Sequence, residues 1–310
     1  KLEYKYNSQF SNIHRMREIY KKWQLINKMN DYDSERIVHP IWKKVQPEAE
    51  KVLMNDEKLI NFLSSPDLQF MFYRKGFSDR QRFELNYLKN TPNETWQSIL
   101  EYSESPIGKP EFDCEYLNIS VNSLGMLYYW AAIASKWDIK TLNTVVEIGG
   151  GYGCFCRVVQ EMILPRITYI MFDLPEMLAL QYYFLSGSST EYKIIPHFSS
   201  SSKIIEGAIN LVPIHYLSNF KVNKYDLIVS HFALSETTKY IQYLVSEKLF
   251  SKAKYLYMTI QDTDSAEWNE LGLEPKVNLL AIIQNPFPQI NTFPFHYDNS
   301  IQVFAEKSVT

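Results

Sequence analysis

The stretch Val145-Val-Glu-Ile-Gly-Gly-Gly-Tyr-Gly-Cys-Phe-Cys156 decides the fold of this chain. An apolar run precedes the glycines, which predicts a strand over 144–148, and a helical pattern follows over 154–164. The chain has ten glycines among 310 residues, and four of them fall between positions 149 and 153. Glycine adopts positive φ angles without steric cost and lets a ligand approach the backbone. The concentration therefore indicates a tight turn between a strand and a helix, open to a ligand.

From residue 141 onward, short β-rich runs alternate with helical stretches. Besides the first strand, strands are predicted at 167–172, 209–212, 225–230 and 254–260, with 192–195 as a competitor for the third, and a closing hairpin near 293–296 and 301–306. Such alternation favours parallel pairing through crossover helices. We therefore expect an α/β fold with a doubly wound, mostly parallel, seven-stranded Rossmann-like sheet. Sheets of this kind bind ligands at the carboxyl ends of their strands.

The first 140 residues have a different pattern and are predicted to be mainly helical. Phe10, Ile13, Met16, Tyr20 and Trp23 recur at steps of three and four residues, which places them on one helix face. The stretch 119–137 is apolar nearly all round, which predicts a buried helix leading into the sheet, and 104–110 has the composition of a loop. We expect residues 1–140 to cover the substrate and residues 141–310 to form the α/β domain.

Composition excludes some classes of protein. The formal net charge is −3, whereas proteins that grip a nucleic-acid backbone usually carry a basic surplus. No run of 18 or more apolar residues is present, so no membrane span is predicted. Three cysteines are too few for a disulfide framework and fit a reducing compartment, and no signal peptide is visible, so a cytoplasmic location is expected.

The pattern of charges around the glycines points to the kind of ligand. A dinucleotide fingerprint requires G-x-G-x-x-G/A, and from Gly149 the third required position falls on Cys154. The observed pattern is instead Glu147-x-Gly149-x-Gly151-x-Gly153. An acidic residue before the first glycine is unfavourable for a pyrophosphate but suits a cation such as S-adenosylmethionine, which carries an ammonium and a sulfonium. A tight turn without a ligand is the alternative, although four glycines and a carboxylate exceed what a turn requires.

A second carboxylate follows at the end of the next predicted strand. Asp173 lies 24 residues beyond Gly149, where an acidic residue can accept hydrogen bonds from ribose hydroxyls. The alternative is that Asp173 only caps the helix that begins at Pro175.

These motifs resemble the class I S-adenosylmethionine-dependent methyltransferases. The segments E-I-G-G-G-Y-G (147–153), F-D-L-P-E (172–176) and Ser230-His-Phe-Ala-Leu-Ser-Glu236 are similar to the sugar O-methyltransferases related to an enzyme that methylates a deoxysugar of a polyether antibiotic, as is the loop at 104–110. The resemblance covers roughly residues 104–260. It implies a methyltransferase sheet and S-adenosylmethionine held by Glu147, Gly149, Gly151, Gly153, Asp173 and Leu174, with Pro213 and His215 bordering the adenine.

The acceptor is expected near the ends of the strands that begin at Tyr225 and Lys254. A sugar hydroxyl is a poor nucleophile, and a general base can add about 10²–10⁴-fold to the rate. His231, just past the fourth strand, is the first candidate for this base, and a histidine that only packs or contacts cofactor is the alternative. Glu236 is the second candidate. Its structural alternative is a place in the first turn of a helix capped by Ser235, where a carboxylate favours the helix dipole.

Three further possibilities concern metal and function. Asp262 and Asp264 could hold Mg²⁺, but a solvated loop is favoured and no metal site is predicted. Amino-group methyltransferases of nucleic acids usually carry N/D-P-P-Y/F where this chain has Ser230-His-Phe-Ala, so a nucleic-acid partner is not expected. A small-molecule methyltransferase or a methyltransferase-like binding subunit without turnover remain alternatives.

The favoured hypothesis is an enzyme, an O-methyltransferase, that modifies a sugar hydroxyl of a polysaccharide, nucleotide sugar or glycosylated metabolite. The sequence leaves the oligomeric state open.

Overall fold

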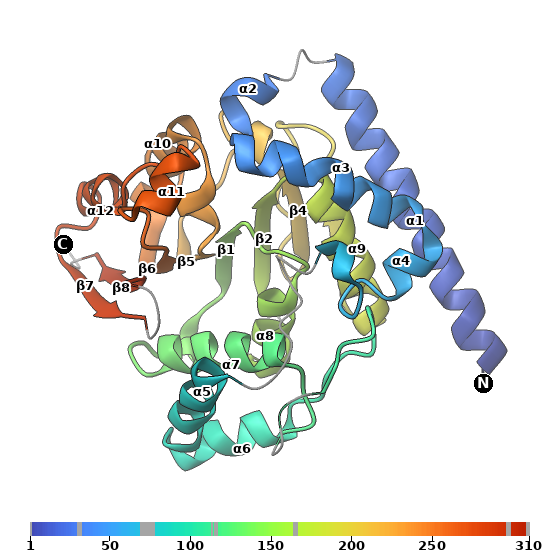
Figure 1. The fold of residues 1–310 in the computed structure, drawn as a ribbon, viewed down its shortest axis with the longest axis horizontal. Helices are drawn as coiled ribbons and strands as arrows, with labels where there is room; N and C mark the ends of the chain where they lie inside the picture. Colours follow the sequence, from blue (N-terminus) through green and yellow to red (C-terminus); the bar gives the residue numbers. More distant parts are fainter. Residues whose placement is uncertain are drawn as a thin grey trace.

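One mixed sheet forms the centre of the molecule. The computed structural model describes residues 2–29, 33–68, 78–112, 114, 117–163, 167–295 and 299–307. Within these residues the sheet has eight strands in the order β3-β4-β2-β1-β5-β6-β8-β7 (Figure 1). The strands are β1 (Thr144–Ile148), β2 (Thr168–Asp173), β3 (Ile194–Pro196), β4 (Ile209–Pro213), β5 (Tyr225–His231), β6 (Ala253–Ile260), β7 (Ile290–Pro294) and β8 (Ile301–Glu306).

The first six strands pair in parallel, and β8 pairs antiparallel with both β6 and β7. The predicted α/β fold, with a doubly wound, mostly parallel sheet and an N-terminal helical region, is therefore confirmed. The predicted number of seven strands is one too low. The runs near 192–195 and 209–212 were expected to be alternatives for one strand, whereas both form strands. The first run is a short edge strand, β3, which pairs with β4 alone and therefore needs only one neighbour. Residue 296, at the end of the predicted hairpin run, lies outside the described residues.

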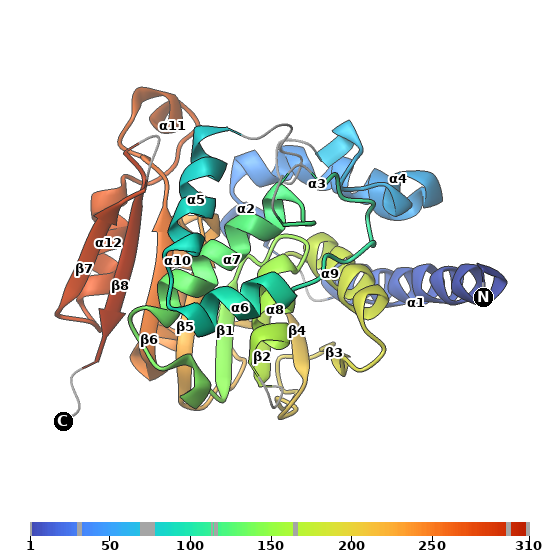
Figure 2. The ribbon, with the colours of Figure 1, turned by 90° about the horizontal axis from the view of Figure 1, so that it is seen from below.

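Helices cover both faces of the sheet, and those at 34–37 and 40–54 lie at its carboxyl end (Figures 1 and 2). None of the described helices is long and apolar enough to cross a membrane. The helices are α1 (Leu2–Met29), α2 (Ser34–Ile37), α3 (Pro40–Met54), α4 (Asp56–Ile60), α5 (Asp79–Lys89), α6 (Asn93–Glu101), α7 (Val121–Ala134), α8 (Cys154–Met162), α9 (Pro175–Ser188), α10 (Lys239–Lys248), α11 (Ala266–Glu270) and α12 (Lys276–Gln284), with 3-10 turns η1 (Pro66–Leu68), η2 (Ile139–Thr141), η3 (Ile214–Tyr216), η4 (Ala233–Glu236) and η5 (Phe250–Lys252).

The alternation of side chains along each strand divides the core in two. Val145 of β1 packs with α1, α3, α5, α7, α8 and α9 on one face, while Val146 and Ile148 pack with α10 and α12 on the other. The predicted apolar stripe of α1 belongs to the first core: Ile13, Met16, Tyr20 and Trp23 are buried, and the side chain of Phe10 lies outside the described residues. The N-terminal region therefore shares its core with one face of the sheet.

Candidate functional site

A cavity of about 730 Å³ opens at the carboxyl ends of β1, β2 and β5. This is the position expected for a ligand in a doubly wound sheet. Most of the predicted site residues lie on its wall, namely Glu147, Gly149, Gly151, Asp173, Leu174, His231 and Glu236. The structure thus brings together side chains that are up to 89 positions apart in the sequence (236 − 147).

The glycine turn lies between β1 and α8, as predicted, and its first glycine has no room for a side chain. Gly149 has a φ of +71°, and a Cβ placed there would lie 2.1 Å from Cβ of Ala233. Its backbone N–H donates to the carbonyl of Phe172 on β2 at 2.9 Å, which fixes the turn against the neighbouring strand. Gly153, with a φ of +96°, is the N-cap of α8 and is not among the residues that line the cavity.

The carboxyl group of Glu147 is buried at the end of β1. It accepts a hydrogen bond from the hydroxyl of Tyr169 at 2.9 Å. Burial raises the pKa of Glu147 to about 8; the Tyr169 hydrogen bond opposes this shift, and the negative charge of Asp173 adds to it. A cation placed beside this carboxyl would favour its ionised form and gain a charge-assisted contact.

Asp173 ends β2, and its side chain forms a hydrogen bond to the glycine turn that follows the neighbouring strand β1. Its carboxylate accepts hydrogen bonds from the backbone N–H of Leu174 at 2.8 Å, from the side-chain amide of Gln181 at 2.8 Å, and from the backbone of Gly150. Burial raises its pKa to about 7, against these three hydrogen bonds. A carboxylate has about four acceptor positions, so capacity for a ligand donor remains. The alternative role as helix cap is not observed, because Leu174 is the N-cap of α9.

Two residues predicted to border the adenine, Pro213 and His215, are not among the cavity-lining residues, whereas Ile214 between them is. Pro213 ends β4 and pairs with Asp173, and His215 belongs to the 3-10 turn η3. Burial lowers the pKa of His215 to about 4. Of these three residues, only Ile214 contributes to the wall.

His231 ends β5, and its ring is clamped between aromatic side chains. It stacks on Tyr129 of α7 with ring centroids 4.4 Å apart and an angle of 12°, and meets the edge of Phe155 at 4.4 Å. Neither ring nitrogen has a hydrogen-bond partner among the described residues. Burial lowers the pKa of His231 to about 3, so the ring is neutral at physiological pH.

Glu236 occupies a different local structure from the one expected. It ends the 3-10 turn η4, while α10 begins three residues later with Thr238 as its N-cap. Placing Glu236 in the first turn of a helix capped by Ser235 was therefore wrong, since the Ser235 hydroxyl donates to the carbonyl of Phe232 and to Gln261 instead. Glu236 accepts hydrogen bonds from the side chains of Gln261 and Trp42.

Burial raises the pKa of Glu236 to about 7, against the two hydrogen bonds that it accepts. A carboxyl with this pKa is about half ionised at neutral pH. It therefore has the protonation behaviour expected of a general base that operates near pH 7.

The N-terminal region forms a wall of the cavity through α2 and α3. His39 donates through Nε2 to the carbonyl of Gly272 at 3.1 Å, which connects this wall to the segment after α11. The carboxylate of Glu176, at the start of α9, accepts from the hydroxyl of Tyr20 and from Gln46, each at 3.2 Å. These contacts hold α1 and α3 over the sheet.

Several lining residues were not predicted from the sequence. They are spread over α3, α5, α7, η4 and α11, and include Trp42, Arg80, Asn122, Tyr129, Phe232 and Trp268. Phe232 has a φ of +66°. Residues other than glycine rarely adopt this backbone conformation, and it is frequent at functional sites. No local pattern in the sequence distinguishes these residues from ordinary core residues.

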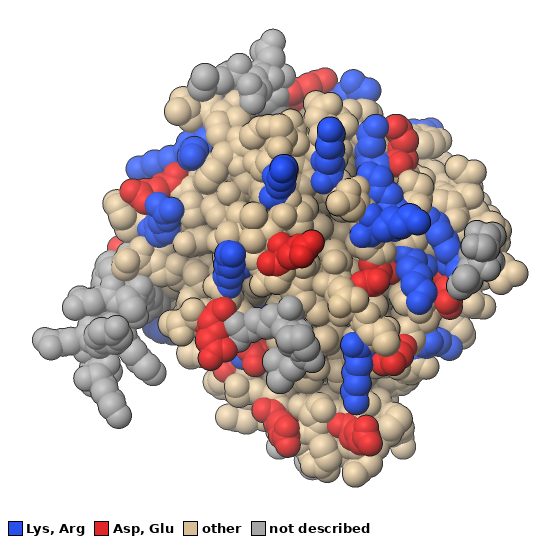
Figure 3. Space-filling view, turned by 180° about the vertical axis from the view of Figure 1, so that it is seen from behind, with Lys and Arg blue, Asp and Glu red and all other residues tan. Residues whose placement is uncertain are grey.

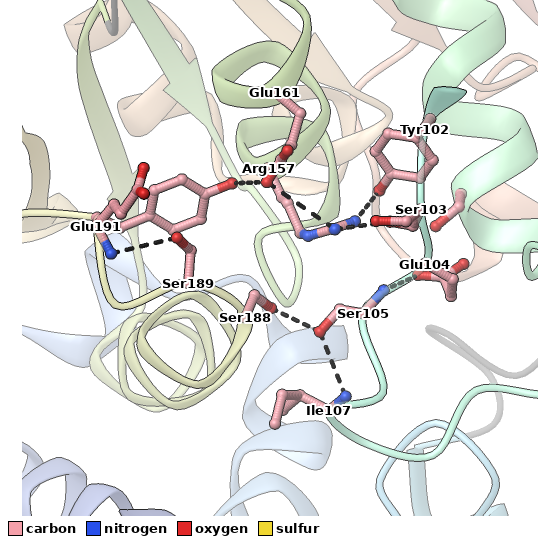
Figure 4. Close-up of polar contacts among 12 residues, drawn as sticks. Tyr102, Ser103, Glu104, Ser105, Ile107, Arg157, Glu161, Ser188, Ser189 and Glu191 are labelled. Carbon is pink, nitrogen blue, oxygen red and sulfur yellow. Dashed lines mark hydrogen bonds and ion pairs between the residues drawn. The ribbon is translucent and has the colours of Figure 1, made fainter. Parts of the chain in front are cut away.

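The loop at 104–110 does not reach the cavity. Figure 4 shows it packed against α8 and α9, where the hydroxyl of Ser105 lies 2.7 Å from that of Ser188 and Arg157 donates to the carbonyl of Ser103 at 2.7 Å. Glu104 accepts from the backbone and hydroxyl of Ser120, the N-cap of α7. The loop therefore connects helices beneath the glycine turn.

Asp262 and Asp264 have a lysine as counter-ion. The ammonium of Lys276 lies 2.6 Å from Asp262 and 3.5 Å from Asp264. In the part of the chain that the structure describes, no three His, Cys, Asp or Glu side chains are grouped so that they could hold a metal ion.

A second cavity of about 990 Å³ lies at the opposite, amino-terminal ends of β1, β2 and β5. Its lining contains Lys140, Lys203, Lys221 and Lys224 but none of the predicted site residues. The back of the molecule shows lysine and arginine side chains interspersed with acidic ones (Figure 3). We therefore place the candidate site at the first cavity.

No protein-family model matches this sequence, and no curated protein matches it. Among solved structures, it is similar to magnesium protoporphyrin IX methyltransferase from Synechocystis with bound S-adenosylhomocysteine (12% identity, TM-score 0.41, covering 75% of this chain and 96% of that one). It is also similar to human N-acetylserotonin methyltransferase in complex with S-adenosylmethionine (10%, 0.38, 93% and 70%). A third is the N-terminal domain of EvdMO1, studied in the presence of S-adenosylhomocysteine and D-fucose (9%, 0.40, 74% and 98%). Likenesses this distant carry no argument about activity, so function rests on the geometry of the site.

Proposed function

We propose that this protein is an S-adenosylmethionine-dependent O-methyltransferase that methylates a sugar hydroxyl of a polysaccharide, nucleotide sugar or glycosylated metabolite. The observation that carries the proposal is the pair of buried carboxyl groups, Glu147 and Asp173, beside a glycine turn on one cavity wall. Two buried acids without a cation are unfavourable when ionised, because burial penalises the charge. A positively charged adenosyl ligand relieves that penalty, whereas a pyrophosphate would increase it.

The residues present fit S-adenosylmethionine. The missing side chain at Gly149 keeps the turn close to Ala233; Glu147 would hold a cationic group of the cofactor, and Asp173 would accept from a ribose hydroxyl. When bound, this cofactor supplies an activated methyl group on a sulfonium. The protein's part is to position the acceptor, exclude water and accept the hydroxyl proton.

Glu236 is the better supported candidate for the base. Its pKa of about 7 lets it accept a proton at neutral pH, whereas the pKa of His231, about 3, makes that ring a weak proton acceptor. Both groups lie on the cavity wall. We therefore assign the base role to Glu236, and to His231 the alternative role of a ring that packs at the cavity wall, since both of its nitrogens are buried.

The other lining side chains suit a polyol. Trp42 and Trp268 offer flat apolar surfaces for the C–H face of a sugar ring, and Asn122 carries an amide donor and acceptor that suit hydroxyls. This combination supports a sugar over a purely apolar acceptor.

The proposal is tested by incubating the protein with S-adenosylmethionine labelled in its methyl group and with sugars, nucleotide sugars, oligosaccharides and RNA. Label transferred to a sugar oxygen is the expected result. Cofactor binding without transfer to any acceptor would instead favour a binding subunit without turnover. Absence of cofactor binding by calorimetry would refute the proposal.

A further inference from the structure

Arg80, on the first turn of α5, lines the cavity together with Asn122 and Tyr129, which lie seven positions apart on one face of α7. Tyr129 stacks on His231 at the end of β5, where the acceptor hydroxyl is expected. The guanidinium therefore belongs to the acceptor side of the cavity. Neither the proposed transfer step nor cofactor binding gives it a role.

Three contacts hold the guanidinium in one orientation. Its Nε donates to Glu84 at 2.8 Å, one terminal nitrogen, Nη2, donates to the hydroxyl of Tyr129 at 3.0 Å, and its carbon lies 4.7 Å from the ring centre of Phe295. No described residue accepts a hydrogen bond from the other terminal nitrogen, Nη1. A fixed guanidinium loses little conformational entropy when it binds a ligand, because its fork is already oriented.

The partner charge lies on the side away from the cavity. Glu84 is fully buried, is not among the lining residues, and its carboxylate faces Gly125 within the packing of α5 against α7. The pair is neutral overall, but its positive end faces the cavity. Arginine has donors and no acceptor, so the group that it binds must carry acceptor oxygens, and charge-assisted contacts with carboxylate or phosphate are the strongest.

We propose that Arg80 is a specificity-determining residue that binds an anionic oxygen group, a carboxylate or a phosphate, on the acceptor. The inference deepens the proposed function and rests on it: the acceptor would be an acidic or phosphorylated sugar rather than a neutral one. Arg80 then orients the sugar ring while Glu236 accepts the proton of the hydroxyl.

The test compares three probes, glucuronate, glucose 6-phosphate and glucose, by NMR titration of the full chain with and without saturating S-adenosylhomocysteine. We expect at least one anionic probe to bind about tenfold or more tightly than glucose. Preference for glucuronate identifies a carboxylate, and preference for glucose 6-phosphate identifies a phosphate. Equal affinity for all three probes would overturn the inference.

Variants separate the charge of Arg80 from its structural contacts. Arg80→Gln combined with Glu84→Gln removes both charges without leaving either one buried alone, and should abolish the preference for anions while S-adenosylhomocysteine affinity is unchanged. Glu84→Gln alone keeps the cation and should preserve or increase the preference. Arg82→Gln, an exposed arginine of the same helix, is the matched control and should behave as the wild type.

A preference that survives in the double variant would overturn the role of Arg80. Failure to bind S-adenosylhomocysteine would refute the proposed function, and the probe comparison on the ligand-free protein would still decide whether Arg80 recognises an anion.

Discussion

At the glycine-turn end of the cavity, Glu147, Gly149 and Gly151 lie within five consecutive positions, and Asp173 ends the adjacent strand β2. At the opposite end, Trp42, Arg80, Tyr129 and Trp268 come from four separate helices and span more than 200 positions of the chain (268 − 42 = 226). The first end is built by a local backbone turn and the second by helices packed over a sheet.

The two ends of the cavity are therefore shaped by different features: backbone conformation shapes the first, and the placement of side chains shapes the second. The proposed cofactor end depends on a conformation that only glycine adopts easily and on two acids that form no ion pair with a lysine or arginine among the described residues. The proposed acceptor end depends on where α3, α5, α7 and α11 are placed, and therefore on the packing of the whole molecule. Substitutions at the two ends are expected to affect different measurable quantities, and the following predictions test this from the largest expected effect to the smallest.

Gly149→Ala is expected to abolish measurable cofactor binding. The substitution forces alanine into a left-handed conformation that costs roughly 1–2 kcal/mol, and its Cβ would lie 2.1 Å from that of Ala233. Calorimetric titration with S-adenosylmethionine and chemical denaturation measure the two effects. The control is Gly207→Ala, which has a similar φ of +64° and nothing within 4 Å of the added Cβ. Equal cofactor affinity in the two variants would show that the glycine turn does not contact the ligand.

Glu236→Gln is expected to lower the rate of methyl transfer by about 10²–10⁴-fold while sparing cofactor affinity. The ionised carboxylate is the active form of a base, so the wild-type rate should rise with pH through about 7 and level off above it. This inflection should be missing from the pH profile of the variant.

His231→Ala serves as the comparison for Glu236→Gln, with cofactor binding spared and a smaller loss of turnover expected. A larger loss in His231→Ala than in Glu236→Gln, together with an unchanged inflection in Glu236→Gln, would return the base role to His231.

Asp173→Ala should weaken S-adenosylmethionine binding about tenfold to a hundredfold, because a hydrogen bond to a charged group contributes roughly 1.5–3 kcal/mol. Its matched control is Asp226→Ala. The Asp226 carboxylate also accepts hydrogen bonds from two backbone N–H groups, those of Asn143 and Thr144, but it lies at the opposite end of the sheet. An Asp173→Ala protein that binds cofactor as tightly as the control would remove Asp173 from the site.

The ligand-free protein should become less stable as pH rises from about 6.5 to 8, above the range in which the lowered pKa of the buried His215 and His231 gives the opposite trend. Burial raises the pKa of Glu147 to about 8 and those of Asp173 and Glu236 to about 7, so the folded state binds more protons than the unfolded state in this range. The stability that these groups contribute is complete below their unfolded pKa and is lost as pH rises through the folded values. A fall in Tm of several degrees is expected by calorimetry.

Bound S-adenosylmethionine should reduce this fall, because a cation favours the ionised carboxylates. A Tm that stays constant or rises between about pH 6.5 and 8 would show that these carboxyl groups are not shifted as described. The combined change Glu147→Gln and Asp173→Asn should flatten the profile by removing two of the three groups.

Much of the fold could be predicted because its signals are local. The apolar run before Gly149, the helical pattern after it and the repeated alternation of strand and helix placed β1, α8, β2, α9, β5 and β6 within a few residues of their observed bounds. The edge strand Ile194–Pro196 was expected only as an alternative to the strand at 209–212, because pairing with a neighbour, and not a pattern of its own, makes it an additional strand. The local structure at Glu236 was misplaced because Ser235 turns its hydroxyl toward Gln261, 26 positions away.

The sequence by itself determined the alternating architecture, the glycine turn and the two acids at the ends of the first two strands, because backbone conformation and hydrophobic periodicity act over a few residues. Only the tertiary structure decided that Arg80 and Trp42 share a cavity with Glu236, and that Pro213, His215 and the 104–110 loop lie outside its lining. It also decided that burial moves the pKa of Glu236 toward neutrality and that of His231 away from it. These properties depend on which groups surround each side chain, and that is fixed by the packing of distant helices against the sheet.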